Sequence, residues 1–414
     1  MVSCDFTSRP MTLQKWQFSP RFRRGAFGWK SDAPIQRIKE AVSEIKKVSK
    51  KELVLAAEGA VLFLEKLSPA IEQVDGSSGA IGTAVNRAIE TLVPIIAKAD
   101  VDQTVRQRWL ERLWDAVEND EIPYLEGMGN FWGELCGKPE IASHWADAFL
   151  PTVASVWGPS ASGHGYFKGT TACLSALYSA NRHEELLTLL ETARFKWWPD
   201  RRWGVKALLA MGRNGDALGY AESSAGLNSP RYAIAAVCEE ILLSTDRVEE
   251  AYVRYAIEAN QHTTNLATFR AIARKYPRKP PETILRDLEA SRPGEEGKWF
   301  AAAKDAGLFD LALEFAGKSP TDPRTLVRAA GDFAVERPPF ALGAGLLALE
   351  YIARGYGYDI TSADVLDAYS AVIQAADAGG VEQATVHAAI RHLLATQTHG
   401  SEFVGKILVH RLHV

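Results

Sequence analysis

The stretch LLSTDRVEEAYVRYA, residues 242–256, carries the pattern that decides the fold. An apolar helix end leads to a turn at Asp246, and an acidic second helix start follows. Three other segments repeat this pattern, and they are LYSANRHEELLTLLE (177–191), LLAMGRNGDALGYAE (208–222) and AKDAGLFDLALEFA (303–316). Equivalent positions are Leu186, Ala217, Ala251 and Ala312, separated by 31, 34 and 61 residues, and PPETILRDLEA around Ile284 fills the double interval. A period of this length is typical of paired-helix solenoids, in which each hairpin stacks on the next.

Helical spacing of apolar residues continues outside the repeats. Ile35, Ile38, Val42, Ile45 and Val48 predict one buried stripe on a helix that begins at Ser31 or Asp32. Further helices are expected over 53–67, 81–99, 101–118, 124–136 and 142–157, with Pro94 as a kink or a terminator. No convincing strand alternation is present, so the sequence predicts an all-α protein. The architecture expected is an α-solenoid of antiparallel helix pairs, tetratricopeptide-like or HEAT-like.

Turn-forming residues divide the chain into expected domains. The run GPSASGHG at 158–165 predicts a linker at 158–167 between two helical regions. We therefore expect an irregular basic arm at 1–30, an N-terminal helical domain at 31–157, a helical-repeat domain at 168–400 and a C-terminal tail at 401–414. The pairs Ser229-Pro230 and Asp322-Pro323, and the segment 361–364, predict helix starts.

Composition narrows the class of protein. Of 414 residues, 47% are apolar and 24% charged, which favours a folded globular chain over a disordered one. The longest apolar run, 340–349, is too short for a membrane span, and no secretory signal is visible. Cys4, Cys136, Cys173 and Cys238 form no CxxC pair, so we expect reduced, mostly buried thiols in the cytoplasm.

Charge is distributed unevenly along the chain. Residues 1–51 hold 12 Lys and Arg against 4 Asp and Glu, whereas the remainder holds 35 against 47. A basic arm on an acidic body is the clearest electrostatic feature, and the arm supports the nucleic-acid alternative given below.

Two clusters combine aromatic and basic residues. The candidate partner-binding residues of the first are Arg21, Arg23, Arg24, Trp29 and Lys30; those of the second are Trp197, Trp198, Arg201, Arg202 and Trp203. Such residues anchor protein interfaces, and they also stack bases and bind phosphates. For the second cluster, core packing of Trp197 and Trp203, with the arginines reaching to solvent, is an equal alternative.

Other patterns favour structural interpretations. The glycine-rich run at 76–83 lacks the lysine of a phosphate-binding loop, and predicts a turn between helices. The nine histidines predict no metal site, and the carboxylate pairs at 118–121, 239–240 and 249–250 predict a solvated acidic face. No cofactor, metal or catalytic residue is expected, although an enzyme site assembled from distant residues stays open.

Two resemblances add to this interpretation. The segments 182–191, 212–222, 246–256 and 307–316 resemble the second helix of tetratricopeptide-like repeats, without the Trp, Leu-Gly and Tyr positions of the first helix. The chain also resembles an uncharacterised bacterial all-helical family, through AAEGAVLFLEKLSPAIE (56–72), GSSGAIGTAVN (76–86) and PGEEGKWFAAAKDAGL (293–308). The second resemblance implies a bacterial source and no particular activity.

These observations favour a helical-repeat scaffold that binds a macromolecular partner, first a protein, through its concave face or its basic arm. The alternative is a helical-repeat protein that binds or processes nucleic acid, in phage defence or mobile-element biology. No membrane partner is expected, and the sequence leaves the oligomeric state open.

Overall fold

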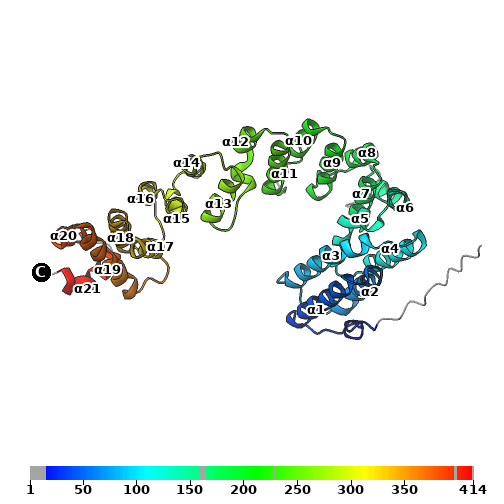
Figure 1. Ribbon diagram of the computed structural model, residues 1–414, viewed down its shortest axis with the longest axis horizontal. Helices are drawn as coiled ribbons and strands as arrows, with labels where there is room; N and C mark the ends of the chain where they lie inside the picture. Colours follow the sequence, from blue (N-terminus) through cyan, green and yellow to red (C-terminus); the bar gives the residue numbers. More distant parts are fainter. Residues whose placement is uncertain (1–14, 159–164, 227–228, 396–398, 413–414) are drawn as a thin grey trace, which may run out of the picture. The chain divides into compact units, whose positions relative to one another are not determined.

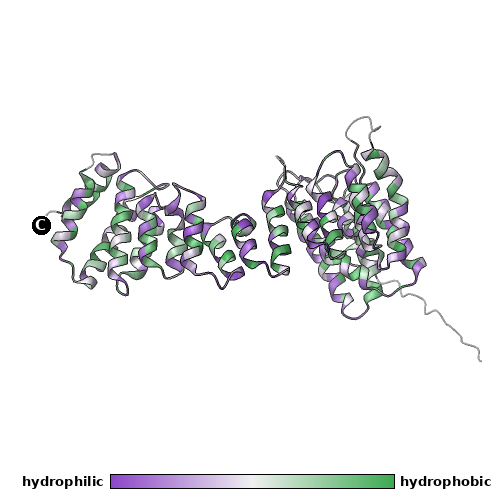
Figure 2. Cartoon of the chain, turned by 90° about the horizontal axis from the view of Figure 1, so that it is seen from above, coloured by the Kyte–Doolittle hydropathy of each residue, from purple (hydrophilic) through white to green (hydrophobic). Residues whose placement is uncertain are grey.

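The computed structural model describes residues 15–158, 165–226, 229–395 and 399–412. Within these ranges the regular secondary structure is helical and contains no strand, which confirms the all-α prediction (Figure 1). The chain forms two compact units, residues 1–230 and residues 231–414. In both units, hydrophobic and hydrophilic residues share the same helices, as expected of helices with one buried side (Figure 2).

The first unit contains ten α-helices within its described residues. They are α1 (Asp32–Ser49), α2 (Leu53–Ile71), α3 (Ala80–Lys98), α4 (Gln103–Glu118), α5 (Trp132–Cys136), α6 (Pro139–Trp157), α7 (Thr170–Ser179), α8 (His183–Thr192), α9 (Trp198–Ala210) and α10 (Asn214–Glu222). Short 3-10 turns lie at Ser19–Arg21 and Glu126–Phe131, so the helix predicted over 124–136 is a 3-10 turn followed by α5.

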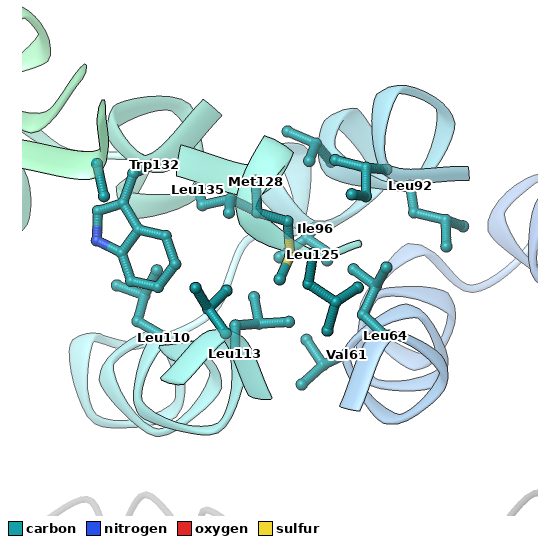
Figure 3. Close-up of a cluster of buried hydrophobic side chains, with 14 of the residues drawn as sticks. Val61, Leu64, Leu92, Ile96, Leu110, Leu113, Leu125, Met128, Trp132 and Leu135 are labelled. Carbon is teal, nitrogen blue, oxygen red and sulfur yellow. The ribbon is translucent and has the colours of Figure 1, made fainter. Parts of the chain in front are cut away.

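The core of this unit forms where α2, α3, α4 and α5 meet. Its buried side chains point toward one another in Figure 3, and include Val61, Leu64, Leu92, Ile96, Leu110, Leu113, Leu125, Met128, Trp132 and Leu135. Each fully buried side chain of this size contributes about 1.5–3 kcal/mol of hydrophobic free energy.

Arg106 of α4 caps the end of α3. Its buried guanidinium donates hydrogen bonds to the carbonyls of Ile96 and Ala99, both at 2.6 Å, and to two further carbonyls. These acceptors include the last carbonyls of α3, which have no partner within their own helix. Helix α3 continues through Pro94 to Lys98, so this proline does not terminate it.

The second unit contains eleven α-helices within its described residues. They are α11 (Arg231–Ser244), α12 (Val248–Ala259), α13 (Asn265–Lys275), α14 (Pro281–Ser291), α15 (Phe300–Asp305), α16 (Phe309–Lys318), α17 (Pro323–Phe333), α18 (Pro338–Ala353), α19 (Ser362–Gly379), α20 (Gln383–Leu394) and α21 (His399–Leu412). Two predicted helix starts are confirmed. Asp322 accepts a hydrogen bond from the Thr325 amide at 2.9 Å, and Thr361 and Asp364 form a capping box.

The segment expected to be a C-terminal tail is part of the second unit. Its described residues belong to α21, and this helix packs against α18. Val404 and Leu408 are fully buried there. An apolar pair four residues apart thus anchors the segment, because it places two side chains on one helix face.

The four repeated segments share one turn geometry. Each places a single residue in the left-handed region between two helices, at φ values of 58° for Asn181, 75° for Gly212, 58° for Asp246 and 76° for Gly307. In each turn the next amide donates a hydrogen bond to the carbonyl five residues back, for example from Arg247 to Leu242 at 2.9 Å. The equivalent positions Leu186, Ala217, Ala251 and Ala312 are all fully buried.

The expected linker at 158–167 remains a prediction. Residues 159–164 lie outside the described residues, and the helices on either side of the segment, α6 and α7, pack against each other. Within the described ranges, α3 alone is long and apolar enough to cross a membrane by length and composition. Seven of its side chains are buried in the core of the first unit.

Candidate functional site

A large groove lies in the first unit, at the ends of several helices. It has a volume of about 1280 Å³ and is lined by the ends of α6 and α8, the start of α9 and the residues after α10. The connection between α8 and α9, residues 193–197, forms one side. Trp197 and Trp198 of the second aromatic-basic cluster therefore line the groove.

The backbone at the start of α9 determines which aromatic side chains are exposed to solvent at the groove. Trp197 is the residue before the helix and has an extended backbone, at φ −74° and ψ 121°. Pro199 lies in the first turn, where its missing N–H costs no helical hydrogen bond. The connection leaves the side chains of Phe195 and Trp197 59% and 56% exposed. Two large aromatic side chains are thus presented to solvent at the groove.

Arg201 and Trp203 belong to the core instead. The Arg201 guanidinium is almost fully buried, pairs with Glu191 at 3.0 Å and donates to the Ser224 hydroxyl at 3.3 Å. It also lies 3.6 Å from the centroid of the Tyr220 ring. Trp203 is buried, with its ring 5.8 Å from the Tyr178 ring. Trp203 therefore packs in the core as the core-packing alternative expects, whereas that alternative is wrong for the exposed Trp197 and for Arg201, which does not reach solvent.

Trp198 and Arg202 occupy intermediate positions. Trp198 lines the groove but is only 6% exposed. Arg202 donates hydrogen bonds to the Pro199 carbonyl at 3.1 Å and to the Asn130 side chain, and burial lowers the pKa of its guanidinium. Trp197 is therefore the predicted residue of this cluster that is most available to a partner.

Charge at the groove comes mainly from the same connection. Arg194 and Lys196 are exposed, and neither forms an ion pair with another described residue. The Arg194 guanidinium lies 5.6 Å from the centroid of the Phe195 ring. Asp200 supplies a carboxyl group at the groove, and burial raises its pKa to about 6, although Arg202 nearby acts to lower it. The connection thus offers a partner two aromatic rings and two cations.

The described part of the predicted basic arm, residues 15–30, lies on the first unit. Phe22 is buried, with its ring 5.0 Å from the Phe63 ring of α2. The Gly25 amide donates a hydrogen bond to the Pro69 carbonyl of α2 at 2.8 Å. Ring contacts of Phe18 and Phe22 with Phe63, together with this backbone hydrogen bond, therefore hold this part of the arm against α2.

The arginines of the arm have partners within the protein. Arg21 pairs with Glu40 at 3.0 Å, and Arg24 pairs with Glu72 at 3.3 Å. Arg23 donates a hydrogen bond to the Pro20 carbonyl at 3.0 Å. Two of the three predicted arginines are therefore partly neutralised by carboxylates of α1 and of the residue after α2.

Trp29 and Lys30 end the arm at the surface. The Trp29 side chain is 72% exposed, while its carbonyl accepts a hydrogen bond from the Asp75 amide at 2.9 Å. Lys30 is exposed as well. The structure therefore leaves Trp29 and Lys30 accessible to a partner. Neither of them lines the groove that contains Trp197.

Two carboxylates are buried where the sequence predicts a solvated face. Asp120 accepts hydrogen bonds from the Leu125 amide at 2.6 Å and from the Ser68 hydroxyl, and burial raises its pKa. Glu239 is fully buried and accepts hydrogen bonds from Asn260 and Tyr276. Sequence spacing gives no signal for either, because the Ser68 hydroxyl lies 52 residues from Asp120 and the two donors to Glu239 lie 21 and 37 residues away.

Thiols and metal ligands complete the inventory of reactive groups. Cys136, Cys173 and Cys238 are buried thiols, as predicted, and Cys4 lies outside the described residues. Burial raises the thiol pKa of Cys136 and Cys173 to about 12, which keeps both protonated at neutral pH. Within the described ranges, no three His, Cys, Asp or Glu side chains gather as a metal-ligand set.

Comparison with known proteins gives no assignment. No family model matches the chain, and no curated protein matches it.

Proposed function

We propose that the protein is a helical-repeat scaffold of the cytoplasm that binds a protein partner at the groove beside α9. The observation that carries the proposal is the pair of exposed rings, Phe195 and Trp197, next to the exposed cations Arg194 and Lys196. Aromatic residues and arginine are the residue types that dominate binding energy at protein interfaces.

The dimensions of the groove support a macromolecular partner. Its volume, about 1280 Å³, exceeds the 300–1,000 Å³ that is usual for small-molecule pockets. The shared turns at Asn181, Gly212, Asp246 and Gly307 support the repeat interpretation, because they give successive hairpins the same local geometry. We extend this pattern to an α-solenoid of helix pairs as part of the proposal.

Nucleic acid is the alternative partner. Exposed rings beside cations also bind single strands, by base stacking and phosphate contacts. The buried Phe22 weakens this alternative for the basic arm, because a ring inside the core is not available to a base.

Affinity capture with matched variants tests the proposal. The tagged full-length protein is used as bait in an extract of the cells that make it, with and without nuclease. We expect a captured protein that resists nuclease and is lost with the double variant Phe195→Ala/Trp197→Ala. The control is Tyr358→Ala, which removes an 84% exposed ring from the second unit. We expect this control variant to capture the partner as well as the parent protein does.

The outcomes separate the two partners. Loss of the captured protein only in the groove variant, followed by direct binding of the purified pair, supports the proposal. Capture that disappears after nuclease treatment points to nucleic acid. Equal capture by the parent and the groove variant would show that the groove does not bind the captured partner.

A further inference from the structure

A second groove lies in the first unit, between α1 and α3. These two helices pack on each other, and both pack on α2. The groove has a volume of about 870 Å³ and follows α1 from Ile35 to its C-cap residue, Lys50. It shares no lining residue with the groove beside α9.

The floor of this groove is aliphatic. Ile35 and Val42 of α1 are half-buried in it, and Ala84 of α3 contributes to the same lining. The sequence predicts a single buried stripe on α1, but the structure divides it. Ile38 and Ile45 are buried in the core, whereas Ile35 and Val42 remain partly open along the groove.

The edges of the groove are basic. Lys39, Lys46 and Lys47 of α1, Lys50 directly after α1, and Arg87 of α3 line it, and all five are exposed. None of them forms an ion pair with another described residue, and the lining includes no Asp or Glu. The groove therefore concentrates positive charge that the described part of the protein does not neutralise.

Two of the three acidic residues of α1, Glu40 and Glu44, are engaged elsewhere. Glu40 pairs with Arg21 and Arg37, at 3.0 Å and 2.7 Å. Glu44 accepts hydrogen bonds from the backbone amides of Gln17 and Phe18, at 2.9 Å and 3.2 Å. Residues of the folded arm thus bind these two carboxylates of α1. The lysines of α1 that line the groove are therefore not paired with them.

We infer that this groove binds an acidic amphipathic helix of a protein partner. The lined segment, from Ile35 to the C-cap residue Lys50, spans 16 residues, which at 1.5 Å per residue is about 24 Å and matches a partner helix of about four turns. An aliphatic floor takes the apolar face of such a helix, as in other helix-in-groove interfaces. The basic edges attract carboxylates on its flanks.

The lining disfavours nucleic acid and lipid. Single strands bind through base stacking on aromatic rings, and this groove contains none. A bilayer surface is broad and cannot reach a floor recessed between two helices. The inference is independent of the proposed function, because the two grooves share no residue.

Peptide binding to the full-length protein tests the inference. The probe is a labelled 16-residue peptide with Leu on one helical face and Glu on its flanks, measured by fluorescence anisotropy. The variant Lys46→Glu/Lys50→Glu reverses two exposed groove charges, and we expect its Kd to rise at least about tenfold, because two attractive contacts become repulsive. The control Lys98→Glu/Lys138→Glu changes two exposed lysines outside the groove and leaves Kd unchanged.

Further probes give outcomes that overturn the inference. A scrambled peptide of equal charge that binds as tightly shows that net charge alone is responsible. An oligonucleotide or a phosphatidylserine vesicle that binds more tightly, with the same loss in the groove variant, assigns the groove to that ligand. Trp197→Ala retains peptide binding, so failure of the proposed function is distinguishable from failure of this inference.

Discussion

Trp197 and Arg201 show how neighbours in one sequence cluster acquire different roles. They lie one helical turn apart, yet Trp197 is exposed and Arg201 is buried. The partners of Arg201 are Glu191, Ser224 and Tyr220, which come from segments before and after α9. Burial at a single residue therefore depends on contacts that the local sequence does not contain.

Asp200 provides a prediction of pH dependence. Its pKa is raised from 3.8 to about 6 by burial, so the native protein binds this proton more tightly than the unfolded chain does. The free energy of unfolding therefore falls as the pH rises between about 4 and 6, and the penalty persists above pH 6. The positive end of α9 offsets part of it.

We expect Asp200→Asn to stabilise the first unit by about 1–2 kcal/mol more at pH 8 than at pH 4. Urea unfolding of the parent and the variant, followed by tryptophan fluorescence at both pH values, measures the difference. A difference that is the same at both pH values contradicts the assignment of the raised pKa.

Helix turns are the elements that the sequence predicts best. Asn181, Gly212, Asp246 and Gly307 are residue types that tolerate a left-handed backbone, and each occupies a turn that the repeats predict. Helix α1 is predicted less completely. Its apolar spacing identifies the helix but not that Ile35 borders a groove, because this depends on where α3 packs.

Gly212 tests the turn geometry. Open space surrounds its Cβ position, so the φ value of 75° alone makes a side chain unfavourable. We expect Gly212→Ala to destabilise the first unit by about 1 kcal/mol. Gly215→Ala is the matched control, since it also has open space but lies in α10, and it should be neutral or stabilising. Thermal unfolding of both variants makes the comparison, and equal effects would argue against this explanation.

At the scale of the whole molecule, each unit has buried polar contacts of its own. In the second unit, Glu239 is fully buried and accepts hydrogen bonds from Asn260 at 2.8 Å, from Lys275 at 2.6 Å and from Tyr276 at 2.6 Å. These residues belong to α11 and α13 or directly follow α12 and α13. Sequence spacing alone does not reveal this cluster, because the donors lie 21 to 37 residues from Glu239.

We expect Glu239→Ala to destabilise the second unit by about 2–4 kcal/mol, because the buried donors lose their acceptor. Hydrogen exchange should accelerate in α11 to α13 more than in α2 to α4. The adjacent Glu240→Ala is the control, since Glu240 is exposed. Unchanged exchange in α11 to α13 would contradict a stabilising role for the cluster.

The buried thiols have a practical consequence. Cys136 and Cys173 lie inside the first unit and Cys238 inside the second, so an alkylating reagent reaches each only when its surroundings open. Peptide mapping distinguishes these sites from Cys4. A timed alkylation in increasing urea thus reports the opening of each unit from its native cysteines, without an introduced label.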